Sequence, residues 1–416
     1  MQQTTLTLNG RSWPRTLSFI SGLGMILASS LTIRHFFNAN YPNSIYGGSF
    51  CDINAFFNCN SSAFSSISQV AGVPLGYFGL IVGGLVCLGA VFPSPAFERT
   101  NKSIALLNAL GVVGLFLFSV FYLGSLCLFC AGYYLFAIMS LFLFSQHAID
   151  RELRGLIWRY FNPSFKHLMT FGVLLLVGAY GMALFHETKK EAQYGSVAAR
   201  VVREFYSLPK VKSPSIISPF MTAQATARFE DAPIQIIEYA DFLCPDCLYM
   251  YEQLARLKQD FKGKINIAYQ FFPLEAKCNQ VVDKNKHPGA CDLAYIAAYQ
   301  PAKFPQIHDE IFANFRAAKN PEWRLSLARR YQAENALNDP DTKDLVQRII
   351  NTGAEYEKTS DQYAHGIRST PTTIVNNRMI IGTLPYAQLK AIFQALVDER
   401  EKGNAKAFIE NWVPAK

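Results

Sequence analysis

Residues 231–247 read D-A-P-I-Q-I-I-E-Y-A-D-F-L-C-P-D-C, and this stretch decides the fold of the C-terminal half of the chain. The β-branched, apolar run Ile234–Tyr239 predicts a strand. The Cys244-Pro245-Asp246-Cys247 motif then opens a helix that we expect to extend to about Asp260. A cysteine at a helix start faces unpaired backbone N–H groups and the positive end of the helix dipole, which stabilise its thiolate. Cys244 is therefore the predicted exposed, low-pKa nucleophile, and Cys247 is its predicted buried resolving partner.

Further elements follow this motif. They are a strand at Ile265–Phe271, a largely helical region at about Ala290–Tyr356, a strand at 371–375, a turn at Asn376-Asn377, a strand at Met379–Ile381 and a helix from Tyr386. This is the element order of thioredoxin. A structural disulfide and half of a zinc site are the alternatives for Cys244 and Cys247, but this half of the sequence offers no second C-x-x-C or suitable histidine cluster to complete a zinc site. We therefore predict a redox-active pair and no bound metal.

The segment 231–247 resembles the DsbA-like branch of the thioredoxin superfamily. Thr370-Pro371 matches the loop of that family in which a cis-proline faces the active cysteines. The resemblance also places Glu238 where the family often has a buried acid that serves the resolving thiol, and an ordinary edge carboxylate is the alternative. One position departs from the pattern, since Asp246 stands where DsbA has a histidine. A carboxylate there opposes the Cys244 thiolate, so we expect a less oxidising disulfide than that of DsbA.

The composition divides the chain into an apolar half and a charged half. Of 416 residues, 50% are hydrophobic and 17% are charged, which is below the ~25% charged residues typical of soluble chains. Residues 1–185 contain 9 Lys or Arg and 4 Asp or Glu, whereas residues 186–416 contain 30 and 27. These values exclude a uniformly soluble protein and a disordered one. The mixed charges of the second half give no case for nucleic-acid binding.

Five apolar stretches of the first half are long enough to cross a bilayer, which takes about 20 residues. They are Thr16–Phe37, Pro74–Phe92, Ser103–Leu123, Leu126–Gln146 and His167–Phe185. A signal peptide is the alternative for the first stretch, because Arg11 and Arg15 precede it. Its apolar core is long, no A-x-A cleavage site is evident and four more spans follow, so we predict a retained span.

Lysine and arginine mark the loops that stay in the cytoplasm. They occur before the first span, at 93–102 and four times at 147–166, whereas the loop at 38–73 and the link at 124–125 contain none. We therefore predict a multi-pass protein of the bacterial inner membrane with a cytoplasmic N-terminus. Five crossings place the second half outside, in the periplasm or in an equivalent space such as a thylakoid lumen.

This topology places eight of the nine cysteines on the outer side, where disulfides persist. They form four candidate pairs: Cys51/Cys59, Cys127/Cys130, Cys244/Cys247 and Cys278/Cys291. The ninth, Cys87, lies in mid-span and is interpreted as an inert small apolar side chain. We predict a structural disulfide between Cys278 and Cys291, with an additional redox relay as the alternative. The sequence F-P-L-E-A-K-C-N…H-P-G-A-C around them resembles thioredoxin-like domains fused to membrane quinone reductases, which favours the structural role.

The first half resembles the vitamin K epoxide reductase family over about residues 15–146. The resemblance is carried by the loop cysteines Cys51 and Cys59, by Cys127-Leu128-Phe129-Cys130 at the outer end of the fourth span, by Ser65, by the stretch G-V-P-L-G at 72–76 and by Tyr134. It implies a loop pair, Cys51/Cys59, and an active-site pair, Cys127/Cys130. It also implies that Ser65 and Tyr134 lie near a quinone pocket. A plain loop hydroxyl is the alternative for Ser65, and core packing is the alternative for Tyr134.

The order of five helices and a thioredoxin domain resembles bacterial fusion members of this family across the whole chain. The fold class this implies is an all-α membrane bundle, with a four-helix core and a fifth linking transmembrane helix, followed by an α/β thioredoxin-like (DsbA-like) domain. We expect four parts: a four-helix quinone reductase domain at 1–150, a cytoplasmic loop with the fifth helix at 151–186, an extracytoplasmic linker at 187–228 and the thioredoxin-like domain at 229–416.

The predicted function is oxidation of thiols in extracytoplasmic proteins. Electrons pass by thiol–disulfide exchange from substrate thiols to Cys244/Cys247, then to Cys51/Cys59, then to Cys127/Cys130 and finally to a membrane quinone such as ubiquinone or menaquinone. By resemblance, Cys59 attacks Cys127 and frees Cys130 to face the quinone. The partners we expect are secreted protein thiols, the quinone pool and the lipid bilayer.

Two other functions fit the same sequence. One is an extracytoplasmic disulfide reductase or isomerase in which electrons flow the other way. The other is a membrane-anchored binding or holdase domain whose disulfides are structural, and it predicts that the reduced Cys244 thiol is unreactive at neutral pH.

Overall fold

The structure is a computed structural model that describes residues 12–45, 56–92, 94–147, 163–283, 285–357 and 366–402. Contacts between residues divide the chain into two compact units. Unit 1 comprises Met1–Ala39 and Phe56–Lys189, and unit 2 comprises Asn40–Ala55 and Lys190–Lys416. The main boundary, at Lys189, lies close to the change from apolar to charged sequence.

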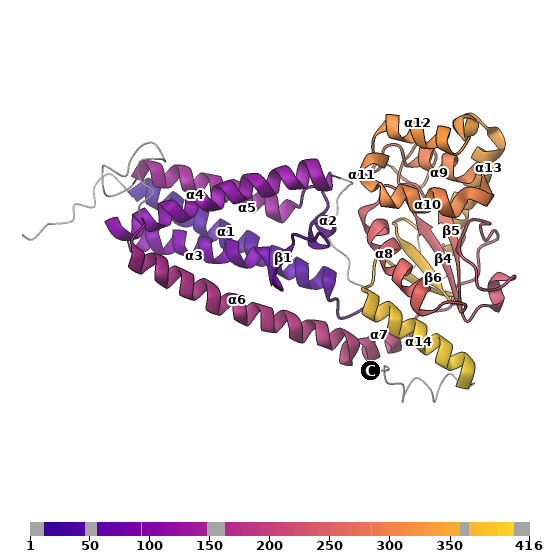
Figure 1. Cartoon of the computed structure of the whole chain (residues 1–416), viewed down its shortest axis with the longest axis horizontal. Helices are drawn as coiled ribbons and strands as arrows, with labels where there is room; N and C mark the ends of the chain where they lie inside the picture. The colour runs from indigo at the N-terminus through magenta and orange to yellow at the C-terminus, as the bar shows by residue number, and fades with distance from the viewer. Residues whose placement is uncertain are drawn as a thin grey trace, which may run out of the picture. The chain divides into compact units, whose positions relative to one another are not determined.

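Unit 1 is built around long helices (Figure 1). They are α1 (Ser12–Asn40), α3 (Leu75–Val91), α4 (Pro95–Leu117), α5 (Leu128–His147) and α6 (Phe165–Tyr194). The third predicted span continues beyond α4 into a π-helical segment, η1 (Phe118–Leu123), which ends at Gly124 with a positive φ of 61°. The prediction of a helix for each of the five spans is confirmed.

Within the described residues, three helices are long and apolar enough to cross a membrane, namely Arg15–Asn40, Pro95–Leu123 and Phe165–Tyr194. The apolar helices Leu75–Val91 and Leu128–Leu143 are shorter. Helix Leu75–Val91 has 17 residues and is therefore about 25 Å long. Large apolar side chains face outward from this unit while Ser18, Ser21 and Ser29 are buried. Small and polar residues between helices, surrounded by an apolar exterior, are typical of proteins in a lipid bilayer.

Helices α1 and α3 cross closely because glycine occupies the crossing. A Cβ atom on Gly22 would lie 2.9 Å from the carbonyl oxygen of Gly83 and 2.6 Å from Cys87 Sγ. Small residues let helix backbones approach in membranes, where packing drives helix association. Cys87 therefore lies at a packed helix crossing, with its Sγ 3.6 Å from the carbonyl oxygen of Phe19.

Unit 2 contains a five-stranded sheet in the order β3-β5-β4-β6-β7. The strands are β3 (Met221–Ala223), β4 (Ile234–Ala240), β5 (Ile265–Phe271), β6 (Thr372–Val375) and β7 (Arg378–Ile381). The central pair β4 and β5 is parallel, and the other pairs are antiparallel. Every predicted strand of this half is present, and the sheet has the mixed topology of a thioredoxin-like domain.

Alternate residues of β4 enter two different cores. Ile234 and Ile236 belong to the cluster that includes α7 (Ser196–Ser207), α8 (Pro245–Asp260) and α14 (Tyr386–Lys402). Ile237 and Tyr239 belong to the other cluster. That cluster includes side chains of α9 (Ala290–Ala298), α10 (Phe304–Ala313), α12 (Pro321–Arg330) and α13 (Pro340–Asn351). Because side chains alternate along a strand, this sheet is covered on both faces.

The region between α6 and β4 differs from the predicted connector. Residues 187–228, which we expected to form a linker, contain the end of α6 and all of α7, and Gly195 separates the two helices with the non-helical values φ −112° and ψ −107°. Glycine is a weak helix former, so a break there costs little. The apolar face of α7 is buried in unit 2. The three-residue strand β3, which no sequence pattern marked, pairs with β5.

Candidate functional site

The turn between β4 and α8 positions the two cysteines of unit 2. Cys244 is the N-cap of α8, and Pro245 occupies the first helical position. Asp241 shapes this turn, because its Oδ1 accepts a hydrogen bond from the Leu243 amide at 2.6 Å and its carbonyl oxygen accepts one from the Cys244 amide at 3.1 Å. Cys244 therefore stands at the amino end of α8, where the helix dipole favours a thiolate.

Cys244 is buried, whereas the sequence predicted an exposed thiol. The residue is 4% exposed, because the loop before β6 covers it. The Cys244 thiol donates to the carbonyl oxygen of Thr370 at 3.4 Å, and the Thr370–Pro371 peptide bond is cis. Cys247 is fully buried, and its Sγ accepts a hydrogen bond from the Asp241 amide at 3.4 Å.

The pKa values of the two thiols move in opposite directions. Burial raises the pKa of Cys244, but a hydrogen bond with Cys247 and the charge of His287 outweigh burial and lower it to about 7. Burial raises the pKa of Cys247 well above its ordinary value, and the adjacent Cys244 raises it further. At neutral pH the reduced pair therefore holds its negative charge on Cys244.

Glu238 lies on β4, six residues before the first cysteine of the motif. It is 3% exposed, and its register partners are Tyr269 on β5 and Thr373 on β6. Burial raises the pKa of Glu238 to about 7, while Lys258 acts in the opposite direction. A carboxyl group that exchanges protons near neutral pH is suited to serve a buried thiol. That Glu238 exchanges protons with the Cys247 thiol stays a prediction.

Asp241 and His287 belong to this site, although the sequence singled out neither. Asp241 Oδ2 lies 2.8 Å from His287 Nδ1, and both side chains are buried. The Asp241 charge opposes the Cys244 thiolate and the His287 charge favours it. One signal was present in the sequence, since His287 lies inside the loop that Cys278 and Cys291 enclose. The expected effect of Asp246, which lies in the first turn of α8, stays a prediction.

Backbone hydrogen bonds bring the cysteines of unit 1 together. The Leu126 amide donates to the Phe56 carbonyl oxygen at 2.5 Å, and the Asn58 amide donates to the Leu126 carbonyl oxygen at 3.2 Å. The segment before α2 (Cys59–Ala63) is thereby joined to the segment before α5. As a result Cys59 Sγ and Cys127 Sγ lie 2.9 Å apart. Cys59 is disulfide-bonded, and Cys127 and Cys130 are in the thiol form.

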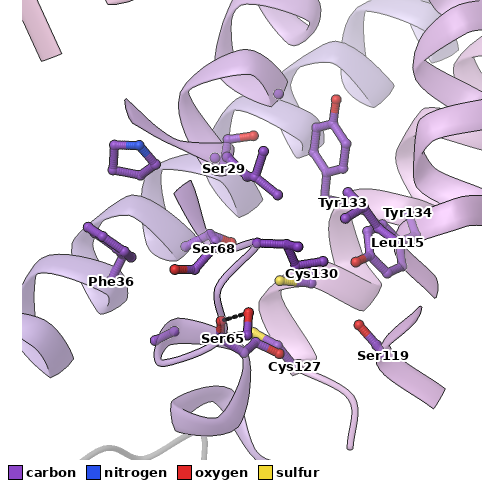
Figure 2. A pocket seen from close by; sticks show the side chains of 18 of the residues that line it. Ser29, Phe36, Ser65, Ser68, Leu115, Ser119, Cys127, Cys130, Tyr133 and Tyr134 are labelled. Carbon is purple, nitrogen blue, oxygen red and sulfur yellow. Dashed lines mark hydrogen bonds between the residues drawn. The ribbon is translucent and has the colours of Figure 1, made fainter. Parts of the chain in front are cut away.

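A cavity of about 220 Å³ lies beside these sulfur atoms. Figure 2 shows Ser65, Cys127, Cys130 and Tyr134 around it. Apolar side chains such as Phe36 and Leu115 also line it. The cavity thus brings together three of the predicted redox cysteines (Cys59, Cys127 and Cys130) with both residues predicted to lie near a quinone.

Several polar residues of the cavity were not predicted, and Tyr133 and Asn108 are two of them. Tyr133 donates a hydrogen bond to Asn108 Oδ1 at 2.8 Å, and both residues line the cavity. Asn108 comes from α4, where an amide within the apolar stretch 103–123 was the available signal. The fourth predicted cysteine, Cys51, lies outside the described residues, as does most of the loop at 147–166 that carries the orientation argument.

Two family models match the chain. The model of the vitamin K epoxide reductase family matches residues 15–145, and a thioredoxin model matches residues 229–395. The two matched regions do not overlap and follow the order expected from the sequence. Both resemblances are therefore confirmed.

Two of the relatives that the chain matches are disulfide bond formation proteins. Probable disulfide bond formation protein D of Bacillus cereus is 24% identical over 172 residues, which cover 38% of this chain and 73% of that protein. Disulfide bond formation protein D of Bacillus subtilis is 22% identical over 181 residues, which cover 41% of this chain and 76% of that protein. The crystal structure of oxidised BdbD from Bacillus subtilis aligns with a TM-score of 0.34 at 19% identity, over 47% of this chain and 100% of that one.

Proposed function

We propose that this chain, which joins a vitamin K epoxide reductase domain to a thioredoxin-like domain, oxidises thiols of extracytoplasmic proteins to disulfides and passes the electrons to a membrane quinone. A membrane thiol–disulfide oxidoreductase is supported by the two matched families and by the disulfide bond formation proteins. The quinone, the order of cysteines and the location of the thioredoxin-like domain are parts of the proposal.

The first exchange takes place at Cys244. A substrate thiolate attacks Cys244 of the Cys244–Cys247 disulfide, and Cys247 leaves and takes up a proton. The second substrate thiolate attacks the substrate sulfur of this mixed disulfide, and Cys244 leaves as a thiolate. The substrate has lost two electrons and formed its disulfide. The pKa of Cys244 is lowered, which suits a thiol that leaves as a thiolate. The pKa of Cys247 is raised, which suits a thiol that takes up a proton when it leaves.

The electrons then pass through Cys51/Cys59 to Cys127/Cys130. In this proposal Cys59 attacks Cys127, Cys130 leaves, and Cys51 then attacks Cys59 and releases Cys127 as a thiol. The contact of 2.9 Å between Cys59 Sγ and Cys127 Sγ carries the proposal, because sulfur atoms must meet for exchange.

The residues around the cavity fit a quinone ring. A planar ring suits a volume of about 220 Å³ with aromatic and aliphatic walls. The Tyr134 hydroxyl would donate to one quinone oxygen, and Cys130 would face the ring. The Ser65 hydroxyl donates to the Ser62 carbonyl oxygen at 2.8 Å, so it would have to turn from Ser62 to donate to the other quinone oxygen. When bound, a quinone accepts two electrons and two protons. The role of this chain is to hold the ring beside Cys130 and to exclude water.

An anaerobic reaction tests class and direction together. Purified full chain is mixed with a reduced, unfolded dithiol protein and a soluble quinone, and disulfide and quinol are measured. We expect them to appear in equal amounts, with Cys130→Ser inactive and Cys87→Ser active as the matched control. Reduction of a disulfide substrate by quinol would establish the reverse direction. Absence of any thiol exchange, with an unreactive Cys244, would establish a binding domain with structural disulfides.

A further inference from the structure

A buried carboxylate connects the cysteine motif to a distant histidine. The side chain of Asp241 is fully buried and has three polar contacts. Its Oδ1 accepts from the Leu243 amide at 2.6 Å, its Oδ2 accepts from the Leu274 amide at 2.6 Å, and the same Oδ2 lies 2.8 Å from His287 Nδ1. The backbone of Asp241 contacts both cysteines, through the Cys244 amide and Cys247 Sγ. One residue thus fixes the cysteine turn and the imidazole together.

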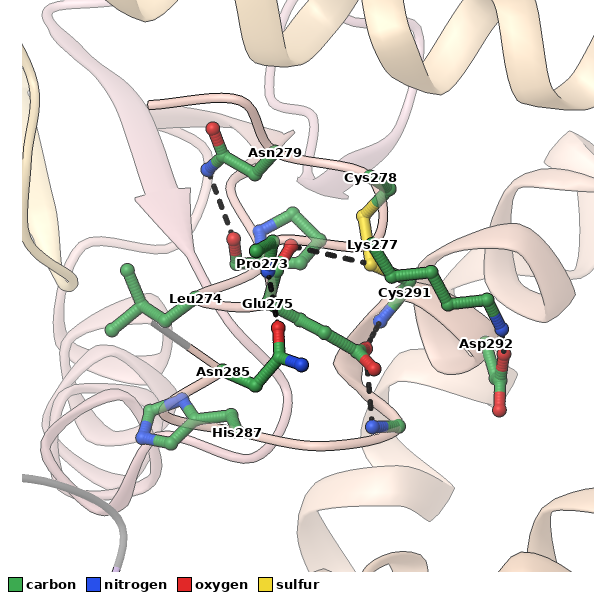
Figure 3. Close-up of a disulfide and its surroundings, with 12 residues drawn as sticks. Pro273, Leu274, Glu275, Lys277, Cys278, Asn279, Asn285, His287, Cys291 and Asp292 are labelled. Atoms are coloured by element: carbon green, nitrogen blue, oxygen red, sulfur yellow. Dashed lines mark hydrogen bonds and ion pairs between the residues drawn. A yellow bond between two sulfur atoms is a disulfide. The ribbon is translucent and has the colours of Figure 1, made fainter. Parts of the chain in front are cut away.

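The loop that presents His287 is closed by the Cys278–Cys291 disulfide (Figure 3). The buried carboxylate of Glu275 accepts hydrogen bonds from the amides of Gly289 and Cys291, at 3.1 Å and 2.9 Å. The His287 amide donates to the Leu274 carbonyl oxygen at 3.1 Å. The position of the imidazole is therefore set by a covalent closure and by buried hydrogen bonds within one loop.

The loop also depends on glycine at its last turn. Gly289 has a φ of +96°, and a Cβ atom there would lie 2.4 Å from the guanidinium carbon of Arg324. Arg324 donates to the carbonyl oxygens of Ala318 and Lys319 and lies 3.6 Å from Asp292, so it is itself held in place. These contacts leave the loop little freedom to move His287 away from Asp241.

Charges on the imidazole and on the thiol act on each other. Burial lowers the pKa of His287, but Asp241 and Cys244 outweigh burial and raise it. Lys319 is the cation that opposes protonation of His287. In return the charge of His287 lowers the pKa of Cys244, where Asp241 has the opposite effect. A cation beside a buried thiolate offsets the loss of hydration that burial imposes.

We propose that His287 is the positioning cation of the Cys244 thiolate, and that the Cys278–Cys291 disulfide serves this purpose by holding the imidazole against Asp241. The proposal rests on Cys244 being the nucleophile of the proposed function. Within the motif this chain has Asp246 where DsbA has a histidine, so a cation beside the Cys244 thiolate comes from outside the motif. The disulfide then belongs to the redox site without taking part in electron transfer.

The test is the pH dependence of Cys244 alkylation in the full chain. Cys244–Cys247 is reduced, peptide mapping verifies that Cys278–Cys291 stays oxidised, and the alkylated Cys244 peptide is quantified over a pH series. In His287→Gln we expect the midpoint to rise by about one pH unit, so that alkylation at pH below both midpoints is about tenfold slower. His287→Lys, which restores a cation, is expected to recover part of the shift.

His308 supplies the matched control, because it is also a buried histidine beside an aspartate, with Nδ1 2.9 Å from Asp309. His308→Gln is expected to leave the Cys244 midpoint unchanged. An unchanged midpoint in His287→Gln, with a low midpoint in the natural chain, would overturn the inference and leave the proposed function standing. An ordinary midpoint in the natural chain would instead contradict the assignment of Cys244 as nucleophile.

The role of the disulfide is tested by combination. Cys278→Ser with Cys291→Ser is expected to raise the midpoint, and to add nothing when His287 is already glutamine, because both changes remove the same cation. Additive shifts would show that Cys278–Cys291 acts on Cys244 independently of His287, and no shift without the disulfide would show that it acts on stability alone. Either result overturns this part of the inference. If the double variant does not fold, the single substitutions at His287 still decide whether the imidazole tunes Cys244.

Discussion

At the level of single residues, the thiols of Cys244 and Cys247 differ in pKa because the start of α8 places them in different surroundings. Cys244 stands at the start of α8 against the Thr370 carbonyl oxygen, and its pKa is lowered to about 7. Cys247 lies one turn into the helix with no exposed surface, and its pKa is raised. Burial is common to both thiols, so the partners of each thiol produce the difference.

This asymmetry predicts which variant traps substrates. In Cys247→Ser the Cys244 thiolate attacks the disulfide of an oxidised substrate, and the mixed disulfide then lacks the Cys247 thiol that would release the substrate, so it accumulates. Reducible high-mass bands on non-reducing gels measure this, and Cys244→Ser is the control that forms none. Trapping by Cys244→Ser in place of Cys247→Ser would reverse the assignment of nucleophile and resolving thiol.

Glu238 predicts a pH dependence of stability. Its pKa is raised from 4.5 to about 7 in the folded chain, so the folded state keeps a proton that the unfolded state releases between these values. Stability is therefore fully present below pH 4.5 and falls as the pH rises to about 7, by a total on the order of 3 kcal/mol. Glu238→Gln removes this loss.

Hydrogen exchange of the β4 amides measures the effect, after correction for the intrinsic pH dependence of exchange. Above pH 7, Glu238→Gln is expected to protect these amides more than the natural residue does, and at pH 4 the two are expected to agree. Glu230→Gln changes an exposed carboxylate near the start of β4 and serves as the control. Equal protection at all pH values would show that Glu238 does not stay protonated.

Sequence patterns located the cysteines but not their electrostatic partners. A C-x-x-C after an apolar strand is local information, and so is the position of Cys127 and Cys130 near a helix start. The contact between Asp241 and His287 joins residues 46 positions apart. Such a pair depends on how a loop returns to the sheet, which spacing along the chain does not encode.

At the level of elements, the crossing of α1 and α3 predicts opposite effects for neighbouring glycines. Alanine at Gly22 would place its Cβ 2.9 Å from a backbone carbonyl oxygen, so the helices must separate. A Cβ on Gly84 meets nothing within 4 Å. We expect Gly22→Ala to destabilise the chain by about 1–3 kcal/mol through overpacking, and Gly84→Ala to be neutral or stabilising because alanine favours helix.

Thermal unfolding of the detergent-solubilised chain compares the two variants. A lower midpoint for Gly22→Ala together with an unchanged or higher midpoint for Gly84→Ala is the expected result. Equal midpoints would mean that α1 and α3 are not in close contact in the membrane-extracted protein.

Long elements were predictable and short ones were not. The apolar helices of unit 1 and the strands β4 and β5 each coincide with a continuous apolar stretch of sequence, from which their approximate length can be predicted. Strand β3 has three residues and forms only because β5 offers a free edge to pair with. The joining of residues 56–58 to Leu126 is likewise made by backbone groups, which carry no sequence signature.

At the level of the whole molecule, charge distribution leads to the remaining prediction. The loop at 38–73 contains Cys51 and Cys59 and no lysine or arginine, whereas the loop at 147–166 contains four. Retention of positive loops in the cytoplasm then places the cysteine loop outside. An odd number of crossings places the thioredoxin-like domain outside as well, in the compartment where disulfides persist.

Labelling of introduced cysteines in intact cells tests this orientation. Arg329→Cys lies on an exposed position of α12 and is expected to react with a membrane-impermeant thiol reagent. Arg154→Cys is expected to react only after lysis, and peptide mapping separates both from the native thiols. The reverse pattern would place the thioredoxin-like domain in the reducing cytoplasm, where glutathione and thioredoxin keep thiols reduced. Oxidation of secreted proteins by Cys244/Cys247 would then be impossible, even with every cysteine assignment intact, because enzyme and substrate would face different compartments.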